Sequence, residues 1–261
     1  MNTPRLSHLT SSVGILVALM TASSSFADSE QLKKKKAMVS LGLASIYAPK
    51  FTGADEYETL PIPIVFVQYD RFTLGGVSGI SYDMFRGKGV KAGLALGYFR
   101  GRNESDANYL QGVGDLESSA DLRLFVRKAF GPFHLTANIK RDFSEDVGGI
   151  TNAVSAGYSY RATSKFSLST NLLARWMNDT HAEAVFGISE QQAQVSSLSQ
   201  TNAKAGIESG TLSFTALYLI NHRWTITSTV STTQYLGDAK QSPITRDPKP
   251  TLFMTSVSYR F

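Results

Sequence analysis

The sequence contains no cysteine and only four histidines. The lack of cysteine excludes disulfide bonds and cysteine-ligated metal sites. His134, His181 and His222 do not have the close spacing of paired metal ligands, and His8 lies in an N-terminal segment that we expect to be removed. The sequence therefore predicts no metal and no cofactor.

Long hydrophobic runs are also lacking. Past residue 37 no segment approaches 18 consecutive apolar residues, so no transmembrane helix is predicted there. The 261 residues are nevertheless 42% hydrophobic, which argues against a disordered chain.

The net charge of +5 comes from the N-terminal region. Of the 26 basic residues, Arg5 and Lys33, Lys34, Lys35 and Lys36 supply five, which leaves 21 basic against 21 acidic residues. The remaining basic residues form no stripe with the aromatic residues, so the sequence does not predict nucleic-acid binding.

The N-terminus has the layout of a secretory signal peptide. Arg5 precedes a short apolar run, Val13–Met20, and Ser25-Phe26-Ala27 offers small residues for cleavage after Ala27. We therefore expect residues 1–27 to be a signal peptide, residues 28–37 to be a polar lysine-rich periplasmic tail, and residues 38–261 to be the folded domain. The tail is either a solvated, partnerless segment or a contact for an acidic partner.

The folded domain alternates apolar and polar residues with period two, which is typical of β-strands. In Phe133–Asp142 the apolar positions are Phe133, Leu135, Ala137 and Ile139. Runs of this kind are about ten residues long, as expected of tilted strands that cross a bilayer. Aromatic pairs flank three short turns: Phe130 and Phe133, Tyr160 and Phe166, and Tyr218 and Trp224. Because lipid offers no partner to an open sheet edge, we predict a closed antiparallel β-barrel in the outer membrane of a Gram-negative cell.

The C-terminus gives a second indication of this fold. The last strand places Phe253, Val257, Tyr259 and Phe261 on one face. Outer-membrane barrels end in a similar aromatic residue, which the barrel-assembly machinery reads. The predicted partners therefore include outer-membrane lipid and this machinery.

The strand number is predicted to be ten to twelve. Splitting at Asp70-Arg71 and at Ser209-Gly210 gives about twelve strands but places two long connections on the periplasmic side. Treating Leu60–Asp83 and Thr201–Ile220 as one long strand each gives about ten and restores the alternation of long and short connections. The expected outer loops are Lys50–Thr59, Gly101–Leu116, Asp142–Gly149, Met177–Gln200 and Leu236–Pro250, with a helical turn within Ser189–Ser197.

Charged residues on the polar strand faces are expected to point into the lumen. They are Asp121, Arg123, Arg127, Lys140, Asp142, Arg161, Arg175 and Arg260. Such a lumen is either filled by paired side chains and water or open as a narrow, anion-leaning pore.

Catalytic motifs are scarce. His181 lies near Asp179 and Glu183, a pair that could activate water, but no nucleophile motif accompanies it and no Gly-x-Ser-x-Gly elbow occurs. Gly75-Gly76 and Gly148-Gly149 lack the lysine and helix of a phosphate-binding loop. We predict that the protein is not an enzyme.

Several short motifs follow one another along the chain: Phe51–Tyr57 with Pro61-Ile62-Pro63, Tyr98–Arg102, Phe186–Ser189, Asp238-Ala239 with Ser242-Pro243-Ile244, and Ser258–Phe261. From about Leu41 to the end, their order and spacing resemble the MipA/OmpV family of outer-membrane proteins. The resemblance implies a non-enzymatic barrel that brings a murein hydrolase (a lytic transglycosylase) together with a murein synthase. Other members resemble surface adhesins or antigens, so three roles stay open: a murein scaffold, a small-solute channel and an adhesin.

Overall fold

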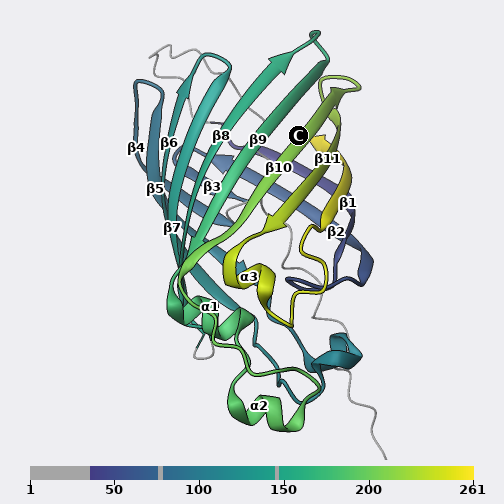
Figure 1. Cartoon of the computed structure of the whole chain (residues 1–261). Helices are drawn as coiled ribbons and strands as arrows, with labels where there is room; N and C mark the ends of the chain where they lie inside the picture. The colour runs from purple at the N-terminus through teal and green to yellow at the C-terminus, as the bar shows by residue number, and fades with distance from the viewer. Residues whose placement is uncertain (1–35, 76–78, 145–146) are drawn as a thin grey trace, which may run out of the picture.

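The computed structural model describes residues 36–75, 79–144 and 147–261 and confirms the predicted all-β barrel. Twelve strands form one closed antiparallel sheet in which each strand pairs with its sequence neighbours and β1 pairs with β12 (Figure 1). The strands are β1 Met38–Pro49, β2 Tyr57–Tyr69, β3 Phe72–Leu74, β4 Ile80–Gly87, β5 Val90–Phe99, β6 Ser119–Phe130, β7 Phe133–Asp142, β8 Ile150–Arg161, β9 Phe166–Met177, β10 Gly206–Leu219, β11 Trp224–Tyr235 and β12 Thr251–Arg260. The signal peptide and most of the lysine-rich tail lie outside the described residues.

Neither way of counting the strands was right in detail. The split at Asp70-Arg71 is correct, but Leu60–Asp83 contributes to β2, β3 and β4, because the chain reverses direction again between β3 and β4. The split at Ser209-Gly210 is wrong, since β10 continues through a register shift between Ile207 and Ser209. With both corrections the long connections all lie at one end of the barrel.

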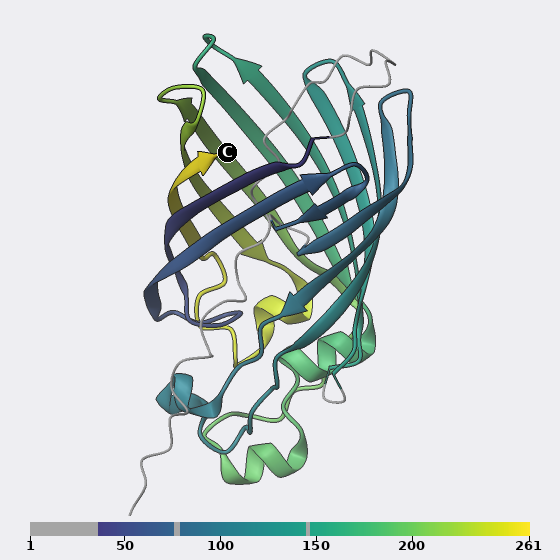
Figure 2. The ribbon, with the colours of Figure 1, turned by 180° about the vertical axis from the view of Figure 1, so that it is seen from behind.

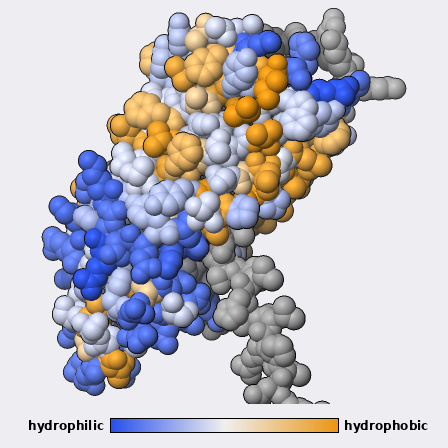
Figure 3. Space-filling view, turned by 90° about the vertical axis from the view of Figure 1, so that its right-hand side faces the viewer, coloured by the Kyte–Doolittle hydropathy of each residue, from blue (hydrophilic) through white to orange (hydrophobic). Residues whose placement is uncertain are grey.

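The outer wall of the barrel is apolar, as the alternation predicts. Leu43, Leu124, Leu172 and Phe214 are more than half exposed on the strands, which suits a surface that faces lipid. Figure 3 shows hydrophobic side chains gathered over the barrel wall and hydrophilic side chains over the end of the molecule that carries the long loops.

The two ends of the barrel differ sharply. At one end the strands are joined by tight turns at residues 70–71, 88–89, 131–132, 162–165 and 220–223. At the other end lie the connections 50–56, 100–118, 143–149, 178–205 and 236–250. The connection between β3 and β4, which was not predicted, faces the same way but lies partway along the wall. In outer-membrane barrels the short turns face the periplasm and the long loops face outward, which assigns the two ends here.

Every helix among the described residues lies in an outer loop. These are the 3-10 turns η2 Glu104–Asp106 and η3 Asn108–Leu110, and the helices α1 Asp179–Phe186, α2 Glu190–Val195 and α3 Gly237–Gln241. Only α2 was expected; it begins after the N-cap Ser189, whose side chain accepts a hydrogen bond from the backbone N–H of Gln192. Within the described part of the chain, no helix is long and apolar enough to cross a membrane.

The aromatic pairs lie at the periplasmic turns. Phe130 and Phe133 stack with their ring centroids 6.0 Å apart. Trp224 packs edge-on against Tyr259 of the last strand, at 5.1 Å between ring centroids. Tyr160 is also exposed, so these rings form a belt where an aromatic side chain can meet both lipid and water.

One part of the barrel wall, beside β2, is low because β3 has only three residues. The pairing of β2 with β3 covers only Val67–Tyr69, so among the described residues the rest of β2 pairs on one side only, with β1 (Figure 2). The carbonyl of Val65 points toward Gly75, away from β1, and backbone groups two residues apart in a strand point the same way. Pro61 and Pro63 therefore occupy positions on the open edge, where a missing N–H costs no ladder hydrogen bond.

Candidate functional site

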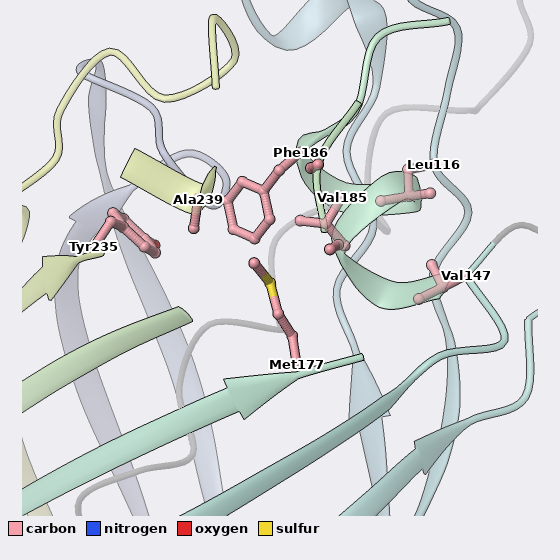
Figure 4. Close-up of a cluster of buried hydrophobic side chains, with 9 residues drawn as sticks. Leu116, Val147, Met177, Val185, Phe186, Tyr235 and Ala239 are labelled. Atoms are coloured by element: carbon pink, nitrogen blue, oxygen red, sulfur yellow. The ribbon is translucent and has the colours of Figure 1, made fainter. Parts of the chain in front are cut away.

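The outer loops fold into a cap that has its own hydrophobic core. Phe186 of α1 packs edge-on against Tyr235 at the end of β11, with ring centroids 6.1 Å apart, and both are buried together with Met177 and Ala239 (Figure 4). A second buried cluster joins four loops, and its members are Phe51, Ala54, Ala107, Leu110, Val113, Ile188, Leu198 and Ile244. Burial of this many apolar side chains makes the cap a packed structure rather than a set of separate loops.

Polar contacts tie the same loops together. Ser242 donates from Oγ to the carbonyl oxygen of Phe186 at 2.6 Å, and Arg102 donates to the carbonyl oxygen of Val185 at 3.1 Å. The pKa of the Tyr109 phenol is raised to about 12, first because of its burial and then because Asp55 lies nearby. Its hydroxyl therefore stays protonated and donates to the carbonyl oxygen of Ile244 at 3.2 Å.

Most of the motifs behind the family resemblance meet in this cap, although they are far apart in the sequence; the last, Ser258–Phe261, instead lies at the periplasmic end of β12. Phe51 and Ala54 from the first motif contact the cluster that holds Ile188 and Ile244. Phe186 belongs to the cluster that contains Ala239. These motifs therefore serve to close the outer end of the barrel.

Beneath the cap the lumen holds a cavity of about 510 Å³. Phe51, Phe186 and Tyr235 line its outer end, while Lys91 and His134, close to the periplasmic turns, line the opposite end. The wall near β1, β2 and β12 is apolar, with Ile46 and Met254 fully buried against it. The opposite wall carries the charges.

Most of the predicted lumen charges line this cavity. Asp121, Arg123, Arg127, Lys140 and Arg175 do so. Asp142 is buried at the end of β7, where its carboxylate accepts hydrogen bonds from the Ser119 hydroxyl at 2.6 Å and the Ser144 N–H at 2.9 Å.

Two of the assignments to the lumen were wrong. Arg161 and Arg260 stand at the last position of their strands, beside the periplasmic turns. Both side chains are exposed there rather than enclosed by the lumen. Arg260 donates to the carbonyl oxygen of His222 at 2.7 Å.

Sequence reasoning missed Glu208, which is 3% exposed. It is the extra residue of the β10 bulge, so it points inward beside Ser209 instead of alternating outward. Its carboxylate accepts a hydrogen bond from Arg175 at 3.1 Å. The interruption of the alternation at this point was the available signal.

His181, the centre of the candidate water-activating group, lies within the predicted outer loop but is not exposed there. It lies buried on α1, edge-on to Phe99, with Nε2 3.9 Å from a Glu208 oxygen. Asp179 instead accepts a hydrogen bond from the Ala205 N–H. The structure therefore separates the residues of the water-activating pair. No cluster of three or more potential metal ligands occurs among the described residues.

Glycines make room for the buried charges. A Cβ atom on Gly97, directly opposite Asp121, would lie 2.8 Å from that carboxylate. A Cβ atom on Gly157 would lie 2.1 Å from the imidazole of His134, its cross-strand partner. A methyl group at either position would displace a side chain that lines the cavity.

The near balance of charges conceals a separation between the two ends. The periplasmic turns and adjoining strand ends carry a basic rim made of Lys36, Arg71, Lys88, Lys128, Arg161, Lys165, Arg223 and Arg260. Its contacts include those of Lys128 with the Lys88 carbonyl and of Arg223 with the Tyr259 hydroxyl, and one acidic residue, Asp70, stands beside Arg71. The outer loops instead carry Asp55, Glu56, Glu104, Asp106, Asp115, Glu117, Asp179, Glu183, Glu190, Asp238 and Asp247, with fewer basic residues among them.

The predicted assembly signal lies on the outer face of β12. Phe253, Val257 and Phe261 are exposed, and Tyr259 packs against Phe261 with ring centroids 4.9 Å apart. The backbone N–H of Phe261 donates to the Val39 carbonyl, so the last residue takes part in closing the barrel.

Solved structures share this architecture at low sequence identity. The NanC porin is 11% identical and aligns over 85% of this chain and 100% of its own, with a TM-score of 0.46. The CymD monoaromatic hydrocarbon channel is 11% identical over 87% of this chain and 88% of its own, with a TM-score of 0.42. The OmpT protein of Vibrio cholerae is 10% identical over 89% and 100%, with a TM-score of 0.40. These likenesses are too distant to bear on ligand or transport.

No curated protein sequence matches the chain. The model of one protein family, described as MltA-interacting protein MipA, matches residues 41–261. That match covers every strand of the barrel except the first residues of β1, and it includes the cap and most of the basic rim. The chain is an outer-membrane β-barrel that belongs to the MipA family.

Proposed function

We propose that this protein is a non-enzymatic scaffold that holds murein-cleaving and murein-synthesising enzymes at the inner face of the outer membrane. The family description names an interaction with MltA, which supports a partner of that kind. The observation that carries the proposal is the sidedness of the barrel. Its outer end is closed by the cap, while its periplasmic end, which faces the murein layer, bears the exposed basic rim.

A surface of this kind acts by contact rather than by transport. Exposed lysine and arginine side chains attract acidic partners and speed their encounter, while neutral contacts fix the geometry. The lysine-rich tail, Lys33–Lys36, would extend the same basic surface. The packed cap does not favour the solute-channel alternative.

Affinity recovery from envelope extracts tests the proposal. The test variant combines Lys88→Gln, Arg161→Gln and Lys165→Gln, three exposed rim positions. The matched control combines Lys204→Gln, Lys240→Gln and Lys249→Gln, three exposed lysines at the capped end. We expect the rim variant to recover several-fold less lytic transglycosylase and murein synthase, and the control to match the unmodified protein. Equal recovery with the rim variant would contradict the scaffold surface.

The tail is tested in the same assay with a mature chain that lacks residues 28–36. We expect recovery of the murein enzymes to fall further when this deletion is added to the rim variant. Unchanged recovery would show that the tail is not part of the contact surface, which would then consist of the rim alone.

A further inference from the structure

Two cations in the lumen face each other without a carboxylate between them. Lys91 of β5 and Arg127 of β6 are direct cross-strand partners, and both line the cavity. Like charges in such a pair lie only about 5 Å apart at Cβ and destabilise the sheet. Neither side chain makes an ion pair within the described ranges. On the other side of Lys91, its cross-strand partner on β4 is a third cation, Arg86. Arg86 forms an ion pair with Asp83 at 2.5 Å.

A second basic row lies closer to the cap. Arg123 is the direct partner of Lys140, and both reach the carboxylate of Asp121, at 3.6 and 3.9 Å. Arg175 is paired with Glu208 in the same region. Arg123 Nε, one Asp121 oxygen and one Glu208 oxygen are buried and have no hydrogen-bond partner among the described residues. Buried polar atoms normally have partners, so Arg123 lacks an acceptor of the kind that an anion supplies, whereas the two carboxylate oxygens call for donors.

The cations that line the cavity outnumber its carboxylates. The basic residues are Lys91, Arg100, Arg123, Arg127, Lys140 and Arg175, and the acidic ones are Asp83, Asp121 and Glu208. The two rows stand four residues apart on β6, or about 13 Å. Phe125 lines the wall between them and offers an apolar surface.

Of the two ends of the barrel, the outer one is covered and the periplasmic one is not. The cap, with Phe51 and Phe186 fully buried, covers the outer end of the cavity. Lys91 and His134 stand within three residues of the periplasmic turns at 88–89 and 131–132. Beyond the basic rim, the unpartnered pair is therefore the charged pair of the cavity that lies nearest its periplasmic end.

We propose that the capped lumen is a blind pocket that binds a small multivalent anion, carrying carboxylate or phosphate groups, from the periplasmic side. Lys91 and Arg127 bind the anion directly, and bound negative charge relieves their mutual repulsion. Arg123 and Lys140 complete the site for an anion long enough to reach past Phe125. The inference does not depend on the scaffold role, because the rim residues tested there lie outside the cavity.

Calorimetric titration of the mature protein in a neutral detergent at low salt tests this site. The probes are citrate for carboxylates, pyrophosphate for phosphates, and sucrose as an uncharged control. We expect saturable binding of at least one anion and none of sucrose; which anion binds identifies the chemistry. Lys91→Met combined with Arg127→Met should weaken binding at least tenfold. Arg141→Met, a matched loss of one exposed strand arginine, should change it less than twofold.

Thermal unfolding gives a second readout that separates binding from misfolding. Without anion, the Lys91→Met and Arg127→Met variant should unfold at a higher temperature than the unmodified protein, because a like-charge pair is gone. Adding anion should raise the unfolding temperature of the unmodified protein and leave that of the variant unchanged. Absence of saturable anion binding, or equal affinity in the double variant, would overturn the proposal.

Discussion

At the scale of single residues, His181 shows how the cap depends on pH. Burial lowers the pKa of its imidazole to about 4, although Glu208 acts in the opposite direction. The side chain is therefore neutral at pH 7, and Arg175 rather than His181 balances the charge of Glu208. Gly149 packs so closely against this helix residue that a Cβ atom there would lie 2.5 Å from the His181 Cβ. A side chain at position 149 would therefore displace the turn of α1 that holds His181.

Stability should consequently fall as the solution is acidified. The unfolded chain binds a proton at His181 near pH 6.5, whereas the folded chain does so only near pH 4. Stability is therefore complete above pH 6.5 and declines between about pH 6.5 and pH 4, by about 3 kcal/mol in total. Urea unfolding at a series of pH values should show this decline in the unmodified protein. His181→Gln should remove most of it, and an equally steep decline in that variant would refute the assignment.

At the scale of elements, short helices and bulges hold the loops to the barrel. Asn178 caps α1: its side-chain oxygen accepts a hydrogen bond from the His181 N–H at 3.0 Å and another from the Ile150 N–H at 2.9 Å. One side chain thereby joins the start of α1 to the start of β8. The β10 bulge plays the corresponding part inside the barrel by directing Glu208 toward Arg175.

Removing the cap of α1 should loosen the outer loops. Asn178→Ala deprives two backbone N–H groups of their acceptor, and the loss of an N-cap costs about 1 kcal/mol. Limited proteolysis should then cleave within residues 178–205 about five times faster, while the barrel strands stay protected. Gln200→Ala, an exposed position in the same loop, serves as the control and should cleave at the unmodified rate.

The sequence predicts elements with a regular period better than it predicts departures from one. Phe133–Asp142 alternates cleanly, and it forms a strand at the expected place. Glu208 was missed because a bulge changes which face a residue occupies without changing its chemistry. The return of the chain at residues 75–79 was missed because β3, at three residues, is too short to show a period.

At the scale of the whole molecule, the barrel has a closed end and a charged end. The cap was beyond sequence reasoning because its residues come from separate loops and meet only when the barrel places those loops side by side. Phe51 and Ile188, for example, share a buried cluster although 136 positions separate them. The basic rim could not be predicted for a similar reason. The numbers of acidic and basic residues do not tell at which end of the barrel each charge lies.

The closure predicts how the barrel behaves in planar bilayers. The unmodified protein should show no steady conductance, because the cap covers the lumen. Replacing Asp179–Ser199 with a short glycine-serine linker removes α1 and Phe186, and should open steps that favour anions. Replacing only α2, which has no buried residue, should leave the barrel closed. Equal conductance in all three proteins would contradict a role of the cap in closure.

The low wall beside β2 has a consequence for how copies of this protein meet in the membrane. An unpaired strand edge is a template on which a neighbouring molecule can extend its own sheet. Here two of the donors that such an extension would use are replaced by the rings of Pro61 and Pro63. The molecule can therefore keep this low part of its wall and still remain a separate barrel when other copies lie beside it in the membrane.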